Sequence, residues 1–143
     1  MVINFLDFVF KLLLAAILGG IIGFEREETR HPAGFRTNII VCMTSAMITA
    51  SALEFFPDPD SVARILTGIL TGVGFIGAGT IITDKNHVIG LTTAASLWSV
   101  TGIGIIAGFG YYAVAVSFTI IIFIFLKLKV IEKKLHRRRW LNI

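Results

Sequence analysis

The side chains with the most chemical potential in this chain are ionisable groups placed where apolar segments end. One group mixes carboxylates, basic side chains and hydroxyls, and its members are Glu25, Arg26, Glu27, Glu28, Arg36, Asp84, Thr92 and Thr93. Carboxylate and hydroxyl oxygens are the ligands that suit Mg²⁺. The arginines compete for the same carboxylates, so the pattern favours an ion-pair network that fixes helix ends. A divalent-cation sensor site is the alternative, and the metal stays unknown.

A second group of charges lies inside the apolar segments, where ionisable side chains are costly and often functional. Asp7 and Lys11 are four residues apart, so they can pair on one helix face. Arg64 lies near the start of another apolar segment. We expect it to pair with Asp7 or Glu54, and the alternative is that its long side chain snorkels to the interface.

Nothing in the sequence indicates catalysis. The histidines His31, His87 and His136 fall outside the apolar segments and have no metal-ligand spacing, and no Ser/His/Asp arrangement is recognisable. The glycine-rich run lacks the Gly-Lys-Ser/Thr of a phosphate loop. The single cysteine, Cys42, lies in an apolar run and is expected to be a packing residue. The sequence therefore predicts a protein that is not an enzyme and needs no cofactor.

The composition indicates a membrane protein. Of the 143 residues, 55% are hydrophobic and only 15% are charged, and the mean hydropathy is +0.85. So small a soluble domain could not bury that much apolar surface. A membrane-spanning helix needs about 20 mostly apolar residues. We therefore predict an all-α polytopic protein with short loops, whose transmembrane domain (1–130) has spans at about 3–24, 38–56, 62–83, 90–108 and 111–130. A basic cytoplasmic tail (131–143) follows.

The distribution of charge predicts one orientation in the membrane. Basic residues concentrate in the first loop and in the tail, whereas the second loop is acidic, with Asp58 and Asp60. The positive-inside rule then places the N-terminus outside and the C-terminus in the cytoplasm. The net charge of +4 comes largely from the tail, which favours a cytoplasmic flank over a nucleic-acid-binding face.

Small residues recur in the spans at helical spacing. The glycines expected to pack helices closely are Gly19, Gly23, Gly68, Gly72, Gly74, Gly77 and Gly79. They predict a homodimer or larger oligomer. The alternative for the third span is a helix broken near 77–79 that lines a polar cavity. Polar stripes with helical spacing are expected to pack on one another, and these are Asn38, Cys42, Ser45 and Thr49; Thr67, Thr71, Gly74 and Ala78; and Thr92, Ser96 and Ser99.

Five blocks of the sequence resemble the MgtC/SapB family of prokaryotic membrane proteins, over about residues 8–126. The blocks are GFERE (23–27), AGFRT (33–37), Arg64, GVGFIGAGTI (72–81) and GLTTAASLW (90–98). The resemblance implies a five-span protein of the cell (inner) membrane that modulates other membrane machinery, such as ATP synthase or ion transport, during low-magnesium or other ionic stress. A small Mg²⁺ or other cation transporter or channel component is the alternative.

The resemblance also implies which polar residues matter, without assigning their chemistry. These family-motif residues are Glu25, Arg26, Arg36, Thr37, Arg64, Thr92, Thr93, Ser96 and Trp98. The partners expected are the lipid bilayer, a second copy and other membrane proteins, but no nucleic acid. Many family members carry a soluble C-terminal domain, for which the residues after 126 are too few. Some virulence-associated members have Asn and Cys at the positions of Thr92 and Ser99, so a virulence role is not implied.

Overall fold

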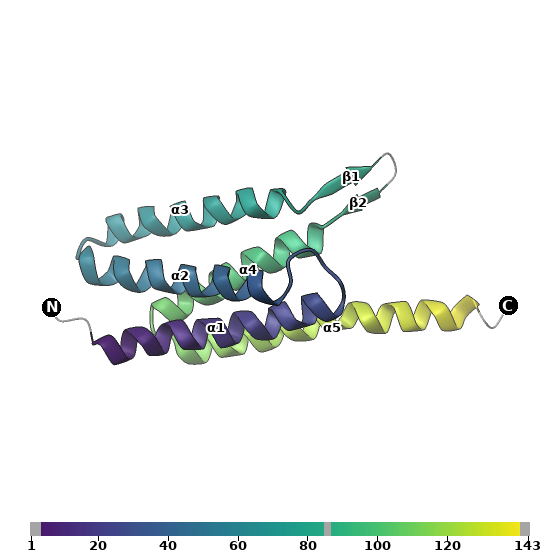
Figure 1. The fold of residues 1–143 in the computed structure, drawn as a ribbon, viewed down its shortest axis with the longest axis horizontal. Coiled ribbons are helices and arrows are strands. Elements are labelled where there is room, and N and C mark those ends of the chain that lie inside the picture. Colours follow the sequence, from purple (N-terminus) through teal and green to yellow (C-terminus); the bar gives the residue numbers. More distant parts are fainter. Residues whose placement is uncertain (1–3, 85–86, 141–143) are drawn as a thin grey trace.

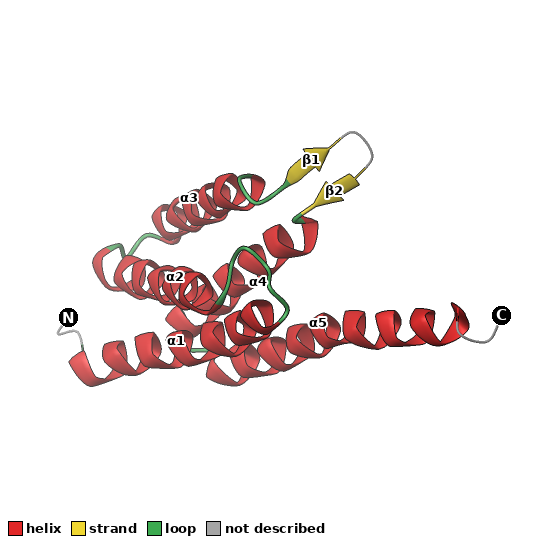
Figure 2. Cartoon of the chain, turned by 45° about the vertical axis from the view of Figure 1, so that its right-hand side comes forward, coloured by secondary structure: helices red, strands yellow, loops and turns green. Residues whose placement is uncertain are grey.

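The computed structural model describes residues 4–84 and 87–140, and side chains for these residues except Asp84 and 129–140. The predictions that concern the Asp84 side chain and the basic side chains of the tail lie outside the described residues. Five helices and one two-stranded hairpin form the fold (Figures 1 and 2). They are α1 (Phe5–Glu28), α2 (Phe35–Phe55), α3 (Pro59–Ala78), β1 (Ile82–Asp84), β2 (His87–Ile89), α4 (Leu91–Gly108) and α5 (Tyr112–Trp140). The predicted all-α class is confirmed.

The five helices correspond to the five predicted membrane spans, with differences at their ends. Helices α1 to α4 are long and apolar enough to cross a membrane. Helix α5 is the longest, but its apolar stretch among the described side chains, Tyr112–Leu128, is shorter than the other four. Successive helices run in alternating directions, and the hairpin connects α3 to α4. With five helices, the two chain ends therefore lie at opposite ends of the bundle (Figure 1).

The predicted C-terminal end of the third span, 62–83, is wrong, because the helix ends earlier. Helix α3 stops at Ala78, and the chain then forms an antiparallel hairpin in which Ile82 pairs with Ile89 and Thr83 with Val88. The apolar residues of this hairpin resemble a membrane span in composition. The glycines near 77–79 therefore mark the end of a helix, not a break inside a span.

The most closely packed part of the core lies between α1, α2 and α4, and α5 adds Ala115 and Leu126 to it. A Cβ on Gly19 would lie 2.7 Å from the Asn38 carbonyl oxygen and from the Cβ of Cys42. On α4, Gly104 meets the Cys42 carbonyl in the same way. A Cβ on Gly108 would lie 2.7 Å from the Ala46 carbonyl oxygen. Each contact therefore depends on a missing side chain.

Helix α3 lies at the edge of this core (Figure 1). Its buried residues are only Val62, Val73 and Gly77. Apart from the backbone of α3 itself, no described atom lies within 4 Å of a Cβ built on Gly68, Gly72 or Gly74. These glycines therefore make no close helix contact within the described monomer.

The predicted polar stripes on α2 and α3 differ in burial, as the glycines of the core and of α3 do. The stripe on α2, from Asn38 to Thr49, is buried, whereas the stripe on α3, from Thr67 to Ala78, is exposed along its length. The expectation that all the stripes pack on one another is therefore wrong for α3, because that face of the helix points away from the core.

Candidate functional site

A buried ion pair lies at the C-terminal end of α1. The Arg26 Nε donates to Glu25 Oε2 at 2.6 Å, and the two side chains are 1% and 0% exposed. The second carboxylate oxygen of Glu25 and the Nη1 of Arg26 are also buried, and neither has a partner among the described residues. A buried pair is stable only when its remaining polar atoms are satisfied, so these two atoms mark a place where a further polar group is needed.

The loop between α1 and α2 is tied to itself next to this pair. The side-chain amide of Asn38 donates to the carbonyl oxygens of Ala33 at 2.9 Å and Gly34 at 2.8 Å. The Glu27 carboxylate accepts from the backbone N–H of Phe35 at 2.8 Å and so caps the start of α2. The amide oxygen of Asn38 is buried without a described partner.

The start of α4 completes this end of the bundle. Helices α2 and α4 run parallel, because Gly104 packs on Cys42 and Gly108 packs on Ala46, four residues further along each helix. With α2 and α4 aligned in this way, Thr93 lies at the level of the α1–α2 loop. A cavity of about 320 Å³ lies there, and its lining residues are His31, Pro32, Val88, Ile89, Gly90, Leu91, Thr92 and Thr93.

Thr93 is the buried polar residue of this cavity wall. Its side chain is fully buried and its hydroxyl has no described partner. Its backbone carbonyl accepts from the Ser96 hydroxyl at 2.8 Å. Thr92, one residue earlier, is exposed.

The described polar side chains at this end of the bundle form hydrogen bonds and ion pairs with one another. Within the described part of the chain, no three His, Cys, Asp or Glu side chains are grouped to hold a metal ion. The acidic residues are instead engaged locally. Glu25 pairs with Arg26, Glu27 caps α2, and Glu28 forms a 2.9 Å ion pair with Lys127 on α5. This arrangement supports the predicted network that fixes helix ends.

The other family-motif residues lie apart from this cavity. Arg36 and Thr37 are exposed on the first turn of α2, and Trp98 is exposed on α4. Asn38 and His31 were not predicted as site residues. Asn38 follows directly on the AGFRT block, and a side-chain amide so near a helix start readily bonds to the preceding loop, which is the signal that could have identified it.

The expected partner of Arg64 is wrong. Arg64 lies 3.7 Å from the Asp58 carboxylate and donates to the Ser61 hydroxyl at 2.8 Å, all within the first turns of α3. Asp7 instead pairs with Lys11 at 2.8 Å, as predicted, and accepts from the Tyr112 hydroxyl at 2.8 Å. Asp7 is thus committed to α5, and the nearer Asp58 takes its place beside Arg64.

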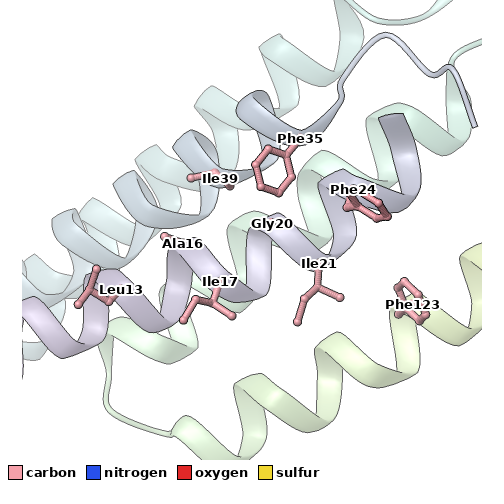
Figure 3. A pocket seen from close by; sticks show the side chains of 9 residues that line it. All are labelled: Leu13, Ala16, Ile17, Gly20, Ile21, Phe24, Phe35, Ile39 and Phe123. Atoms are coloured by element: carbon pink, nitrogen blue, oxygen red, sulfur yellow. The ribbon is translucent and has the colours of Figure 1, made fainter. Parts of the chain in front are cut away.

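A second hollow in the described surface is wholly apolar. It measures about 600 Å³ and lies between α1, α2 and α5, with Ile21, Phe35 and Phe123 among its lining residues (Figure 3). Its apolar lining suits contact with hydrocarbon and offers no polar group to a solute. The polar end of the bundle is therefore the candidate site.

Comparisons with known proteins agree with this membrane architecture. A model of the MgtC family matches residues 12–137. The protein MgtC of Salmonella typhimurium (strain LT2) is 42% identical over 115 residues, which cover 80% of this chain and 49% of that protein.

Two further relatives have similar coverage. The Escherichia coli (strain K12) protein named "Putative magnesium transporter YhiD" is 38% identical over 117 residues, which cover 77% of this chain and 54% of that protein. An uncharacterised protein of Haemophilus influenzae is 37% identical over 138 residues, 90% of this chain and 58% of that protein. The chain thus spans about half the length of the curated relatives it matches. No solved structure matches it.

Proposed function

The chain belongs to the MgtC family, and on that premise we propose that it is a non-enzymatic membrane protein that modulates other membrane machinery during low-magnesium or other ionic stress. Its helices make it a multi-pass membrane protein. The name of the E. coli relative refers to magnesium transport, which supports a link between this chain and magnesium. ATP synthase and ion transporters are the machinery that the resemblance suggests.

The observation that carries a modulating role is that the described buried faces of α2 and α4, which pack against α1, contain no acidic residue. Hydroxyls on these faces donate to carbonyls of their own helix: Ser45 to Val41 and Thr49 to Ser45, each at 2.8 Å, and Thr101 to Leu97 at 2.9 Å. Glycine contacts with backbone bring the three helices close together. A cation pathway would be expected to have a carboxylate at mid-depth, and none of the described buried residues of α2 and α4 supplies one. This favours modulation over transport.

The test is a flux measurement on the full chain in liposomes that contain a magnesium-sensitive dye. We expect no Mg²⁺ flux above that of empty liposomes. We also expect a change in ATP-driven proton pumping when ATP synthase is reconstituted together with the chain. Flux that depends on the protein, is lost in Glu25→Gln and is retained in Glu28→Gln would instead establish the transporter alternative.

We further propose that the chain forms a homodimer through the exposed face of α3. This face carries Gly68 and Gly72, the exposed hydroxyls of Thr67 and Thr71, and the exposed guanidinium of Arg64. Polar side chains of membrane helices usually face protein rather than lipid. Small residues four apart let two helices approach closely.

Charge complementarity makes a second copy the fitting occupant of this face. Arg64 and the exposed Asp60, one turn closer to the helix start, give this face charges of both signs, which a second copy of α3 can complement. We expect Gly72→Leu to convert the dimer into a monomer, as measured by light scattering in detergent and by cross-linking in membranes. Gly102→Leu is the matched control, because Gly102 on α4 also has no described atom nearby. A dimer that persists in Gly72→Leu contradicts the proposal.

The proposed location is the prokaryotic inner membrane, with the N-terminus outside and the C-terminus in the cytoplasm. The placement of the chain ends at opposite ends of the bundle supports an odd number of crossings (Figure 1). Arg30 and Arg36 lie at the end opposite Asp58 and Asp60, as the positive-inside rule requires. Fusions after residue 143 test this: green fluorescence is expected, and alkaline phosphatase activity there contradicts the orientation.

A further inference from the structure

The first turns of three helices differ in how their free N–H groups are satisfied. The start of α2 receives the Glu27 carboxylate at the Phe35 N–H. The start of α3 receives the Asp58 carboxylate, at 3.0 Å from the Ser61 nitrogen. At the start of α4 the N-cap residue is Gly90, which has no side chain to cap the helix. The first N–H groups of an α-helix have no partner within the helix, so those of α4 require one from elsewhere.

The residue before α4 explains why the chain supplies no cap there. Gly90 has a φ of 98°, and a Cβ on it would collide with the Thr80 carbonyl. The position is thus restricted to glycine, which has no side chain to accept a hydrogen bond. The sharp return from the hairpin into α4 therefore leaves the helix start open.

The open helix start borders the 320 Å³ cavity, which is lined by Leu91, Thr92 and Thr93 from the first turn of α4. Thr93 supplies an independent sign that a ligand belongs there, because its fully buried hydroxyl has no described partner. The Thr101 hydroxyl, further along α4, donates to a carbonyl four residues earlier. Thr93 has no helical carbonyl at that distance, since α4 begins only two residues before it.

The charges around this cavity favour an anion. Hydroxyls and N–H groups are donors, and the N-terminal end of a helix carries a partial positive charge of about half a unit. Each described carboxylate of the neighbouring α1 end has one oxygen engaged, by Arg26, by Lys127 or by the start of α2, and none of these acidic residues is among those that line the cavity. His31, from the α1–α2 loop, lines the same cavity.

We propose that this cavity binds a phosphate group, held by the N–H groups of the first turn of α4 and by the hydroxyls of Thr92 and Thr93. Helix starts are established phosphate sites because both their N–H groups and their dipole favour an anion. The phosphate comes either from inorganic phosphate in the aqueous phase or from the headgroup of an anionic phospholipid. This site goes beyond the modulating role, and its test does not depend on that role.

The test is a binding measurement on the full chain in a phosphate-free maltoside detergent at constant ionic strength. Inorganic phosphate and short-chain phosphatidylglycerol are titrated separately, with sodium chloride as the salt control, by calorimetry and by the shift in Tm. Thr93→Val removes the hydroxyl while keeping the shape, and Thr93→Ser restores it. Thr101→Val is the matched control, since that buried hydroxyl is bonded within α4.

We expect phosphate to raise the Tm of the native chain, of Thr93→Ser and of Thr101→Val. Thr93→Val should bind about tenfold or more weakly, the loss expected for one hydrogen bond to a charged group. Should Thr93→Val fail to fold, the exposed Thr92→Val provides the same comparison. Phosphatidylglycerol that competes with phosphate and binds more tightly than phosphate identifies a lipid headgroup as the source. Phosphate that binds when the lipid does not identifies free phosphate as the source. The proposal is overturned if neither ligand binds beyond the salt control, or if the threonine variants bind like the native chain.

Discussion

Two glycine pairs with identical spacing behave differently in this molecule. On α1, a Cβ at Gly23 would lie 2.8 Å from the Phe35 Cα, and Gly19 is equally close to α2. On α3, Gly68 and Gly72 have the same spacing but no described atom within 4 Å. The small-xxx-small pattern therefore predicts that a helix can be approached closely. It does not predict whether the approaching helix belongs to the same chain.

The contrast extends to the ion pairs of the same two regions. The Glu25–Arg26 pair at the C-terminal end of α1 is almost fully buried. In the Arg64–Asp58 pair at the start of α3, the two side chains are 72% and 55% exposed. Burial raises both the strength of a charge pair and the cost of breaking it. The α1–α2–α4 core thus depends on its own residues for stability, whereas α3 presents its polar face outward.

The largest expected effect comes from breaking the buried pair. Arg26→Ala should lower the free energy of unfolding by about 3–5 kcal/mol, because Glu25 is left charged and unpartnered. Thermal unfolding in detergent measures the change. Arg64→Ala is the control on α3 and should leave the monomer's Tm nearly unchanged, since exposed pairs contribute little. Equal losses in the two variants would contradict the distinction between the regions.

The second effect comes from filling matched glycines. Gly19→Leu should cost about 1–3 kcal/mol or more, because its side chain must displace the Asn38 backbone. Gly68→Ala should instead leave the monomer fold intact or stabilise it by up to about 1 kcal/mol, since alanine is the better helix former. Chemical unfolding followed by circular dichroism shows whether each variant lowers or raises the free energy of unfolding. Destabilisation by Gly68→Ala in a monomeric state would mean that α3 packs on something within the chain.

A smaller effect is expected where α5 joins the core. Tyr112→Phe removes the 2.8 Å hydrogen bond to Asp7 but keeps the ring against Phe10. We expect a loss of about 1 kcal/mol, the usual contribution of one hydrogen bond. Ser117→Ala is a suitable control because its exposed hydroxyl bonds only within α5. An unchanged Tm in Tyr112→Phe would show that the apolar contacts alone hold α5 in place.

The smallest effect concerns pH at the start of α3. Hydrogen bonds from the Ser61 hydroxyl and backbone N–H hold the pKa of Asp58 below its usual range. A lowered folded-state pKa gives stability that is present above the unfolded pKa and is lost as the pH falls through the folded value. Hydrogen exchange at the Ser61 amide, corrected for intrinsic rates, should therefore lose protection only in strong acid. Asp58→Asn should abolish this pH dependence, and an unchanged profile in that variant would assign the titration to another group.

The sequence predicts the helices well because their signal is local. Apolar length marks α1, α2 and α4, and the turn at 108–110 separates α4 from α5, as expected from its two glycines. The end of α3 could not be placed, because Ile81, Ile82, Val88 and Ile89 have a membrane-like composition. Their hairpin is decided by pairing between the two strands and by the return at Gly90.

The candidate site was predictable only in part, for a related reason. The motifs identify Glu25, Arg26 and Thr93, and these are buried at one end of the bundle. Which carboxylate meets which base depends on packing. The Arg64 prediction failed because Asp7 is committed to Lys11 and Tyr112, a contact between residues more than a hundred positions apart.

Helix α5 changes from apolar to charged composition without any change in its backbone. Its apolar stretch ends near Leu128, but the helix continues to Trp140 and extends past the other helices (Figure 1). At 1.5 Å per residue, this extension is about 18 Å long. If the helix moves as one body, a small tilt of α5 inside the bundle displaces its far end by several ångströms. A contact at that end would then be mechanically connected to the interior of the bundle.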